Sequence, residues 1–153
     1  MKKEMLEGGH IVTELIKDFL VNKTEENLKT LMSCLRSSDV FISVEVQFSE
    51  EDRKMFAGMN PGDKISPKDK VKINPGIIRT KEGKVYFPVF TMKEKIPEDR
   101  MKNASVMKIP FTECIKMTMA GKDTEAMVVN PFSDNFLLNK PNLEIISKLP
   151  PME

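Results

Sequence analysis

Few side chains in this sequence could perform acid–base or nucleophilic chemistry. The chain has one histidine, His10, and two cysteines, Cys34 and Cys114. Histidine is the side chain whose ordinary pKa lies nearest neutral pH, so a serine or cysteine nucleophile would depend on His10 as its base. His10 follows Gly8 and Gly9 close to the start of the chain, where order is commonly low. The sequence therefore predicts no catalytic dyad or triad.

The two cysteines are better explained as core residues. Cys114 falls on the apolar stripe of a predicted helix, and Cys34 precedes Leu35 near the end of another. A free, buried cysteine behaves as a small hydrophobic residue. The enzymatic alternative pairs Cys114 with Lys116 or Lys122. Cys114 and Lys116 are two residues apart, and such residues face different ways on a helix, which counts against that pairing. With so few histidines and cysteines, no zinc site of the usual spacing can form. We predict no catalytic, cofactor-binding or metal-binding residue.

Charge and glycine patterns exclude further classes. The seven glycines form neither a dinucleotide-binding nor a P-loop pattern. The net charge of +1 is unlike the strongly positive charge of a typical nucleic-acid-binding domain. A local run of acids next to Arg53 and Lys54 is most simply a solvated surface, and it consists of Glu50, Glu51 and Asp52. The basic cluster is interleaved with acids and has no aromatic neighbour for base stacking; its members are Lys64, Lys68, Lys70 and Lys72. Nucleic acid is therefore not an expected partner.

A candidate recognition surface lies where an apolar strand stops at Asn130-Pro131. Ligand crevices in α/β proteins form beyond strand ends. There Asn130 offers an amide, Pro131 removes a backbone donor, and Phe132 provides an apolar anchor. Asn-Pro is equally ordinary turn chemistry, in which the asparagine satisfies nearby backbone groups. Both interpretations remain open.

Periodicity predicts the elements that position these residues. Residues 10–21 have helical spacing, and Thr24 caps a second helix that runs to Arg36. Residues 40–48 alternate as a half-buried strand, with Ile42, Val44, Val46 and Phe48 on the buried face. Residues 49–70 are polar and are predicted to be a long loop or an insertion.

In the second half of the sequence, the pattern of residues 77–90 predicts a hairpin, with Gly83 at a positive φ. Proline cannot donate to a ladder, so Pro88 is expected at a sheet edge or beside a bulge, and Thr91 is expected to cap a short helix. A strand over 106–109 precedes a helix over 110–120 with Gly121 at its end. The predicted stripe of that helix is Phe111, Cys114, Ile115, Thr118 and Met119. Strands over 126–129 and 136–138 and a helix from residue 139 complete the chain.

This order, roughly ααβββ(α)βαββα, predicts an α+β fold with a mixed central sheet of about five to six strands and helices packed on it. A chain of 153 residues fits one domain over 1–153, with residues 1–9 expected to be disordered. No signal-peptide core and no run of ~20 apolar residues is visible. With two cysteines expected to be reduced, the sequence predicts a cytoplasmic protein without membrane segments.

Three segments carry a resemblance to a known family. Residues 87–94 read FPVFTMKE, residues 109–115 read IPFTECI, and residues 127–138 read MVVNPFSDNFLL. Their order and spacing resemble the SseB protein N-terminal domain family over roughly residues 24–148. Met92 stands where the family often has serine, and the 49–70 stretch is longer than is usual. The resemblance implies a compact α/β domain in the bacterial cytoplasm, and it supplies no catalytic residue.

Two functional hypotheses follow. The first is a non-catalytic module that docks a protein partner through a sheet edge, marked by Pro88, or through the Asn130-Pro131 turn. The second is a small-ligand domain, binding an amino acid or a related metabolite, with a pocket lined by Thr91 and Asn130 and with weak or no enzymatic activity. No cofactor is expected in either.

Overall fold

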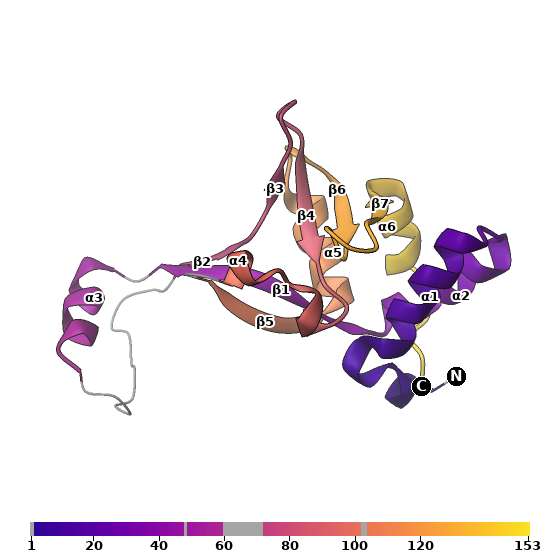
Figure 1. The fold of residues 1–153 in the computed structure, drawn as a ribbon, viewed down its shortest axis with the longest axis horizontal. Helices are drawn as coiled ribbons and strands as arrows, with labels where there is room; N and C mark the ends of the chain where they lie inside the picture. Colours follow the sequence, from indigo (N-terminus) through magenta and orange to yellow (C-terminus); the bar gives the residue numbers. More distant parts are fainter. Residues whose placement is uncertain (1, 48, 60–71, 102–103) are drawn as a thin grey trace.

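The structure is a computed structural model that describes residues 2–47, 49–59, 72–101 and 104–153. Its helices are η1 (Lys3–Gly9), α1 (His10–Val21), α2 (Glu25–Arg36), α3 (Glu50–Ala57), η2 (Lys93–Lys95), α4 (Glu98–Met101), α5 (Phe111–Ala120) and α6 (Lys140–Ser147). Its strands are β1 (Asp39–Gln47), β2 (Lys72–Pro75), β3 (Ile78–Arg79), β4 (Val85–Val89), β5 (Ser105–Pro110), β6 (Thr124–Val129) and β7 (Phe136–Asn139). In Figure 1, α3 lies apart from the other helices, beyond the end of β1 and β2.

Side-chain caps explain where several helices begin. The predicted cap at Thr24 is confirmed, because its hydroxyl oxygen accepts a hydrogen bond from the amide of Asn27 at 3.1 Å. Asn139 does the same for α6 by accepting from Asn142. Each such cap satisfies an amide that has no partner inside the helix and stabilises the fold by about 1 kcal/mol.

The strands form two sheets. One has three strands in the order β2-β1-β5, and the other has four in the order β3-β4-β6-β7. All neighbours are antiparallel except β4 and β6, which are parallel. Within the described residues, one isolated bridge joins the sheets, in which Phe41 and Phe90 exchange backbone hydrogen bonds of 2.8 and 2.9 Å.

The α+β class is therefore confirmed, but the expected single sheet of five to six strands is wrong. Alternation and turn residues locate strands along the chain, but they do not state which strands pair. Two sheets that meet at one bridge have the same sequence pattern as one continuous sheet.

The core lies where the helices cover the inner faces of the sheets. The inner face of the four-stranded sheet contributes Phe87, Val89, Met127, Val129 and Leu138. α5 and α6 pack on this face, and α2 contacts both helices. Cys34 and Cys114 are 2% and 0% exposed, so both core predictions are confirmed. A fully buried Val, Leu, Phe or Met side chain, such as those on the inner face of this sheet, contributes about 1.5–3 kcal/mol to folding.

The α5 stripe departs from prediction at its end. Phe111, Cys114, Ile115 and Thr118 are buried, whereas Met119 is 41% exposed at the edge of the stripe. Gly121 ends the helix at a negative φ and not in the left-handed region. A side chain there would collide with Thr124, so close approach explains this glycine.

Ser43 is also more buried than the alternation of β1 predicts. Ile42 and Val44 are buried as expected, but Ser43 is only 5% exposed. Its carbonyl accepts a 2.8 Å hydrogen bond from the amide of Gly76, which lies against it. The predicted polar face of β1 is therefore covered at this point. The side chains of Val46 and Phe48 lie outside the described residues.

Two segments that were expected to lack structure contain helices. The expectation of disorder over residues 1–9 is wrong for residues 3–9, which form η1 with Leu6 4% exposed. One apolar anchor and a 3.0 Å hydrogen bond from the Lys3 amide to the Glu153 carbonyl hold this segment. Residues 50–57 form α3, capped by Ser49, so the acidic run is a helical first turn.

The remainder of the 49–70 stretch, residues 60–70, lies outside the described residues. The predicted basic cluster falls there too, except for Lys72, which begins β2.

None of the helices in the described part of the chain is long and apolar enough to cross a membrane.

Candidate functional site

The turn between β6 and β7 has an unusual backbone. Asn130, Phe132 and Asn135 have positive φ values of 52°, 74° and 50°. The amide of Asn130 donates to the Val89 carbonyl at 2.8 Å, which ties the turn to the end of β4. The amide of Asn135 donates back to the Asn130 carbonyl at 3.0 Å and closes the turn. Asparagine tolerates this conformation, but for a bulky residue such as Phe132 it is an outlier.

The side chain of Asn130 holds this turn from inside. It is 0% exposed. Its Oδ1 accepts from the Thr91 amide, and its Nδ2 donates to Thr91 Oγ1 and to Asp134 Oδ2, each at 2.9 Å. The amide is therefore fully engaged within the protein and is not presented to a ligand. The structure agrees with the turn interpretation of this residue.

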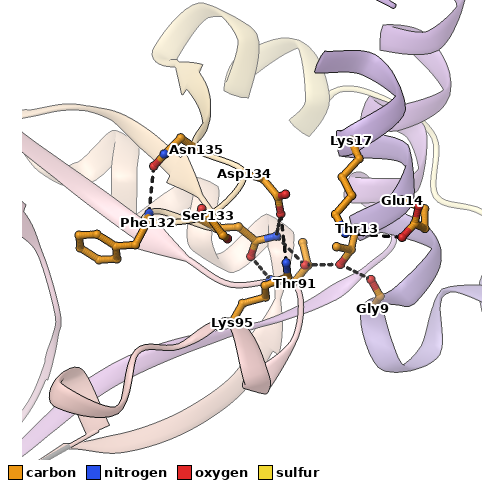
Figure 2. A network of polar contacts seen from close by, with 11 residues as sticks. Gly9, Thr13, Glu14, Lys17, Thr91, Lys95, Phe132, Ser133, Asp134 and Asn135 are labelled. Atoms are coloured by element: carbon orange, nitrogen blue, oxygen red, sulfur yellow. Dashed lines mark hydrogen bonds and ion pairs between the residues drawn. The ribbon is translucent and has the colours of Figure 1, made fainter. Parts of the chain in front are cut away.

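Thr91 extends the network to the N-terminal helix, as Figure 2 shows. Its Oγ1 lies 2.6 Å from Thr13 Oγ1, and Thr13 Oγ1 donates to the Gly9 carbonyl at 2.7 Å. A hydroxyl has one proton, so the Thr91 hydroxyl must be the donor to Thr13. Thr91 does not cap a helix as expected. The cap of η2 is Met92, which makes no side-chain hydrogen bond.

Gly9 makes this contact possible. Its φ is +78°, and a Cβ at this position would collide with the Thr91 carbonyl. Only glycine accepts both the conformation and the close approach. The N-terminal segment is thereby packed directly against the residue that anchors Asn130.

An ion pair fastens the outer side of the turn. Lys95 Nζ lies 3.7 Å from Asp134 Oδ2, and their side chains are 23% and 9% exposed. The same carboxylate oxygen accepts from Asn130, so Asp134 joins the turn to η2. This pair is better shielded from solvent than the helical surface pairs of the described chain, whose net contributions are small.

Pro88 lies where β4 has a ladder partner on the β6 side and none on the β3 side. It is buried in β4, which lies between β3 and β6. The β3 ladder ends at the Ile78–Tyr86 pair, so the missing donor of Pro88 interrupts no bond on that side. A register irregularity lies two residues earlier, between Val85 and Tyr86. Pro131 is also buried.

Phe132 is the exposed member of the predicted surface. Its side chain is 61% exposed, and its ring points away from the buried network in Figure 2. The guanidinium carbon of Arg100 lies 5.1 Å from the ring centroid, a cation–π contact. Sequence reasoning missed Arg100, because it belongs to the four-residue helix α4, far from Phe132 in the chain. No periodic pattern signals such a contact.

The groups that were weighed for chemistry lie elsewhere. His10 is exposed at the first position of α1. Burial raises the pKa of the Cys34 thiol, and it raises the pKa of the Cys114 thiol to about 12 with a further contribution from Glu113. Both thiols are therefore protonated near neutral pH and are poor nucleophiles. Among the described residues, no three His, Cys, Asp or Glu side chains are grouped to hold a metal ion.

Thr91 also lines a pocket of about 330 Å³. It is lined by the glycines before α1, the start of β1 and Lys108 of β5; among its lining residues are Gly8, Gly9, Ser38, Phe41 and Thr91. Asn130 does not line it. The structure thus brings Thr91 to both features, but the expected pocket shared by Thr91 and Asn130 is not formed there.

A protein-family match includes most of the residues of this hydrogen-bond network. The family model of the SseB protein N-terminal domain matches residues 12–144. The chain belongs to this family. The matched range contains Thr13, Thr91, Arg100 and the whole turn, whereas Gly9 precedes it. A comparison with curated proteins and a comparison with solved structures each gave no match.

Proposed function

We propose that this SseB-family chain is a non-catalytic interaction module that docks a protein partner through Phe132 and the turn that carries it. The observation that supports the proposal is the backbone of Phe132. A non-glycine residue in the left-handed region costs on the order of 1–3 kcal/mol and persists where the surroundings impose it. In this protein, the strained residue is Phe132, whose backbone φ is 74° and whose aromatic ring is 61% exposed.

The surrounding turn makes Phe132 a pre-organised anchor. Asn130 and Asp134 fix the turn from within, and the Arg100 guanidinium lies over the ring of Phe132. Aromatic and arginine side chains are enriched among residues that dominate binding energy at protein interfaces. A ring that is already ordered loses little side-chain entropy when a partner covers it. We place this activity in the bacterial cytoplasm, as the family resemblance implies.

Crosslinked capture from a lysate of the source organism tests the proposal. The unaltered chain is expected to retain a defined partner, and Phe132→Ala is expected to reduce its recovery about tenfold or more. Leu137→Ala is the matched control, since Leu137 is a large apolar residue that is 52% exposed. Equal recovery with Phe132→Ala, or no retained protein, would contradict the proposal.

Phe132→Gly separates binding from folding. Glycine adopts a positive φ without strain. Removing the ring also removes the cation–π contact with Arg100, which is worth about 0.5–1 kcal/mol at an exposed site. We expect the free energy of unfolding in urea to stay within about 1 kcal/mol of the starting value or to rise, while partner recovery falls. A large loss of stability would instead assign Phe132 to folding.

The alternative is a small-ligand domain that uses the 330 Å³ pocket beside Thr91. Its volume is at the lower end of the range for small-molecule sites, and Phe41 and Lys108 supply apolar and charged walls. A thermal-shift screen of amino acids, related metabolites and nucleotides tests this alternative. A ligand at 100 times its Kd would stabilise the fold by ~2.7 kcal/mol, and a flat screen would remove the alternative.

A further inference from the structure

Arg100 connects Phe132 to a second feature of the surface. Within the described residues it makes no ion pair, and its described contact is the ring of Phe132. A guanidinium that stacks on a ring keeps the N–H groups along its edge free to bind a carboxylate in a bidentate manner. This arginine therefore presents an ordered positive charge directly beside an exposed apolar anchor.

Arg100 also lines a pocket of about 320 Å³. β1 contributes Ser43 and Glu45, Gly76 follows β2, and α4 contributes Asp99 and Arg100. Gly76 lies so close to β1 that an added Cβ would be 2.6 Å from Ser43 Oγ. The described residues offer no ion-pair partner to the carboxylates of Glu45 and Asp99. The lining of the pocket therefore combines the carboxylates of Glu45 and Asp99 with the positive charge of Arg100.

We propose that the Phe132 site takes an extended peptide segment of the partner that carries an apolar, an acidic and a basic side chain in that order. The apolar side chain packs on Phe132, the acidic side chain pairs with Arg100, and the basic side chain enters the pocket beside Glu45 and Asp99. This inference rests on the proposed function and names the chemistry of its partner.

The arrangement favours a peptide because the Phe132 ring, the Arg100 guanidinium and the pocket follow one another along the surface. Arg100 both contacts the Phe132 ring and lines the pocket, so it lies between the two features. An occupant confined to the pocket would leave the anchor uncovered, whereas an elongated chain covers both. Alternating charges also fix the direction of that chain, since the reversed order places like charges together.

An array of immobilised nonapeptides tests this inference with the full chain as the probe. One set carries an apolar, an acidic and a basic residue at every spacing in a glycine–serine background, and the matched set has the two charges exchanged. We expect at least tenfold stronger binding to the first set, which corresponds to about 1.4 kcal/mol. Arg100→Glu should shift the preference at the acidic position to a basic residue, and Asp99→Lys should weaken the preference for the basic residue.

Arg79→Glu is the matched control, because it reverses an exposed arginine on β3 that does not line the pocket. It should leave the array pattern unchanged. Circular dichroism spectra should show that all three variants fold, and a variant that does not fold is replaced by Glu45→Lys. Equal binding to the two sets, no binding to either, or a pattern that Arg100→Glu leaves unchanged overturns the inference. Phe132-dependent capture from lysate without a charge-order preference would keep the proposed function and remove only the peptide chemistry.

Discussion

At the scale of single residues, the two most informative side chains are inward-facing. The side-chain amide of Asn130 bonds to Thr91, which follows β4, and to Asp134 within the turn. Cys114 sits in the core with no exposed surface. Neither residue presents chemistry to solvent, and both can be tested by what their loss does to folding.

Asn130→Asp should be strongly destabilising. The substitution replaces the Nδ2 donor with an oxygen that faces the Asp134 carboxylate at the former 2.9 Å contact. A buried charge without a partner typically costs 3–5 kcal/mol, so we expect a loss of about 3 kcal/mol or more in urea unfolding. Asn135→Asp is the control, because Asn135 is exposed and uses only its Oδ1 in the described contact. Similar stability for the two variants would contradict the role given to Asn130.

Cys114 should make stability fall at high pH. Burial raises its pKa in the folded state to about 12, whereas the unfolded thiol ionises near its ordinary value. The unfolded state therefore loses its proton first, and stability that is present below about pH 9 is lost as the pH rises toward the folded value. The free energy of unfolding should drop by on the order of 1 kcal/mol per pH unit in this window. Urea unfolding of Cys114→Ala should show a correspondingly shallower pH slope, and equal slopes would contradict the assignment.

At the scale of elements, the N-terminal segment and the end of β4 are joined by the Gly9–Thr91 contact. η1 ends at Gly9, α1 supplies Thr13, and Thr91 follows β4. The hydrogen bonds run from there into the turn that carries Phe132. The Gly9–Thr91 approach holds the junction of η1 and α1 against the residue that follows β4.

Gly9→Ala should therefore cost more than other glycine substitutions. Gly9, Gly8 and Gly83 all have positive φ, but only at Gly9 would a Cβ overlap backbone atoms. Gly8→Ala and Gly83→Ala should each lower the free energy of unfolding by about 1–2 kcal/mol, because alanine is disfavoured at a positive φ. Gly9→Ala should exceed them by at least about 1 kcal/mol in thermal or urea unfolding. Equal losses at the three positions would show that the Gly9–Thr91 approach is not tight.

At the scale of the whole molecule, the ends of the chain close over the start of β1. The Lys3 amide donates to the Glu153 carbonyl at 3.0 Å, and the Met152 amide donates to Ser37 Oγ at 2.7 Å. Figure 1 shows the two termini near one another beneath α1 and α2. Residues before α1 thereby become part of the core through Leu6.

Leu6→Ala tests whether this segment folds with the rest. Leu6 is 4% exposed and Met5 is 53% exposed, so the pair differs mainly in burial. We expect Leu6→Ala to lower the free energy of unfolding by about 2–3 kcal/mol, and Met5→Ala by less than about 0.5 kcal/mol. If Leu6→Ala has no effect, residues 3–9 do not contribute to the folded core.

The sequence by itself determined the local structure and much of the family assignment. Helical stripes, the Thr24 cap, the Gly83 turn and the buried cysteines follow from short-range periodicity and from residues with strong conformational preferences. It also directed attention to the turn at Asn130. Tertiary structure decided the pairing of strands into two sheets, the folding of residues 3–9, the burial of Pro88 and Thr91, and the contact of Arg100 with Phe132. Each of these depends on groups distant in the chain, because strand partners and close approaches are fixed by packing between elements and leave no periodic trace within them.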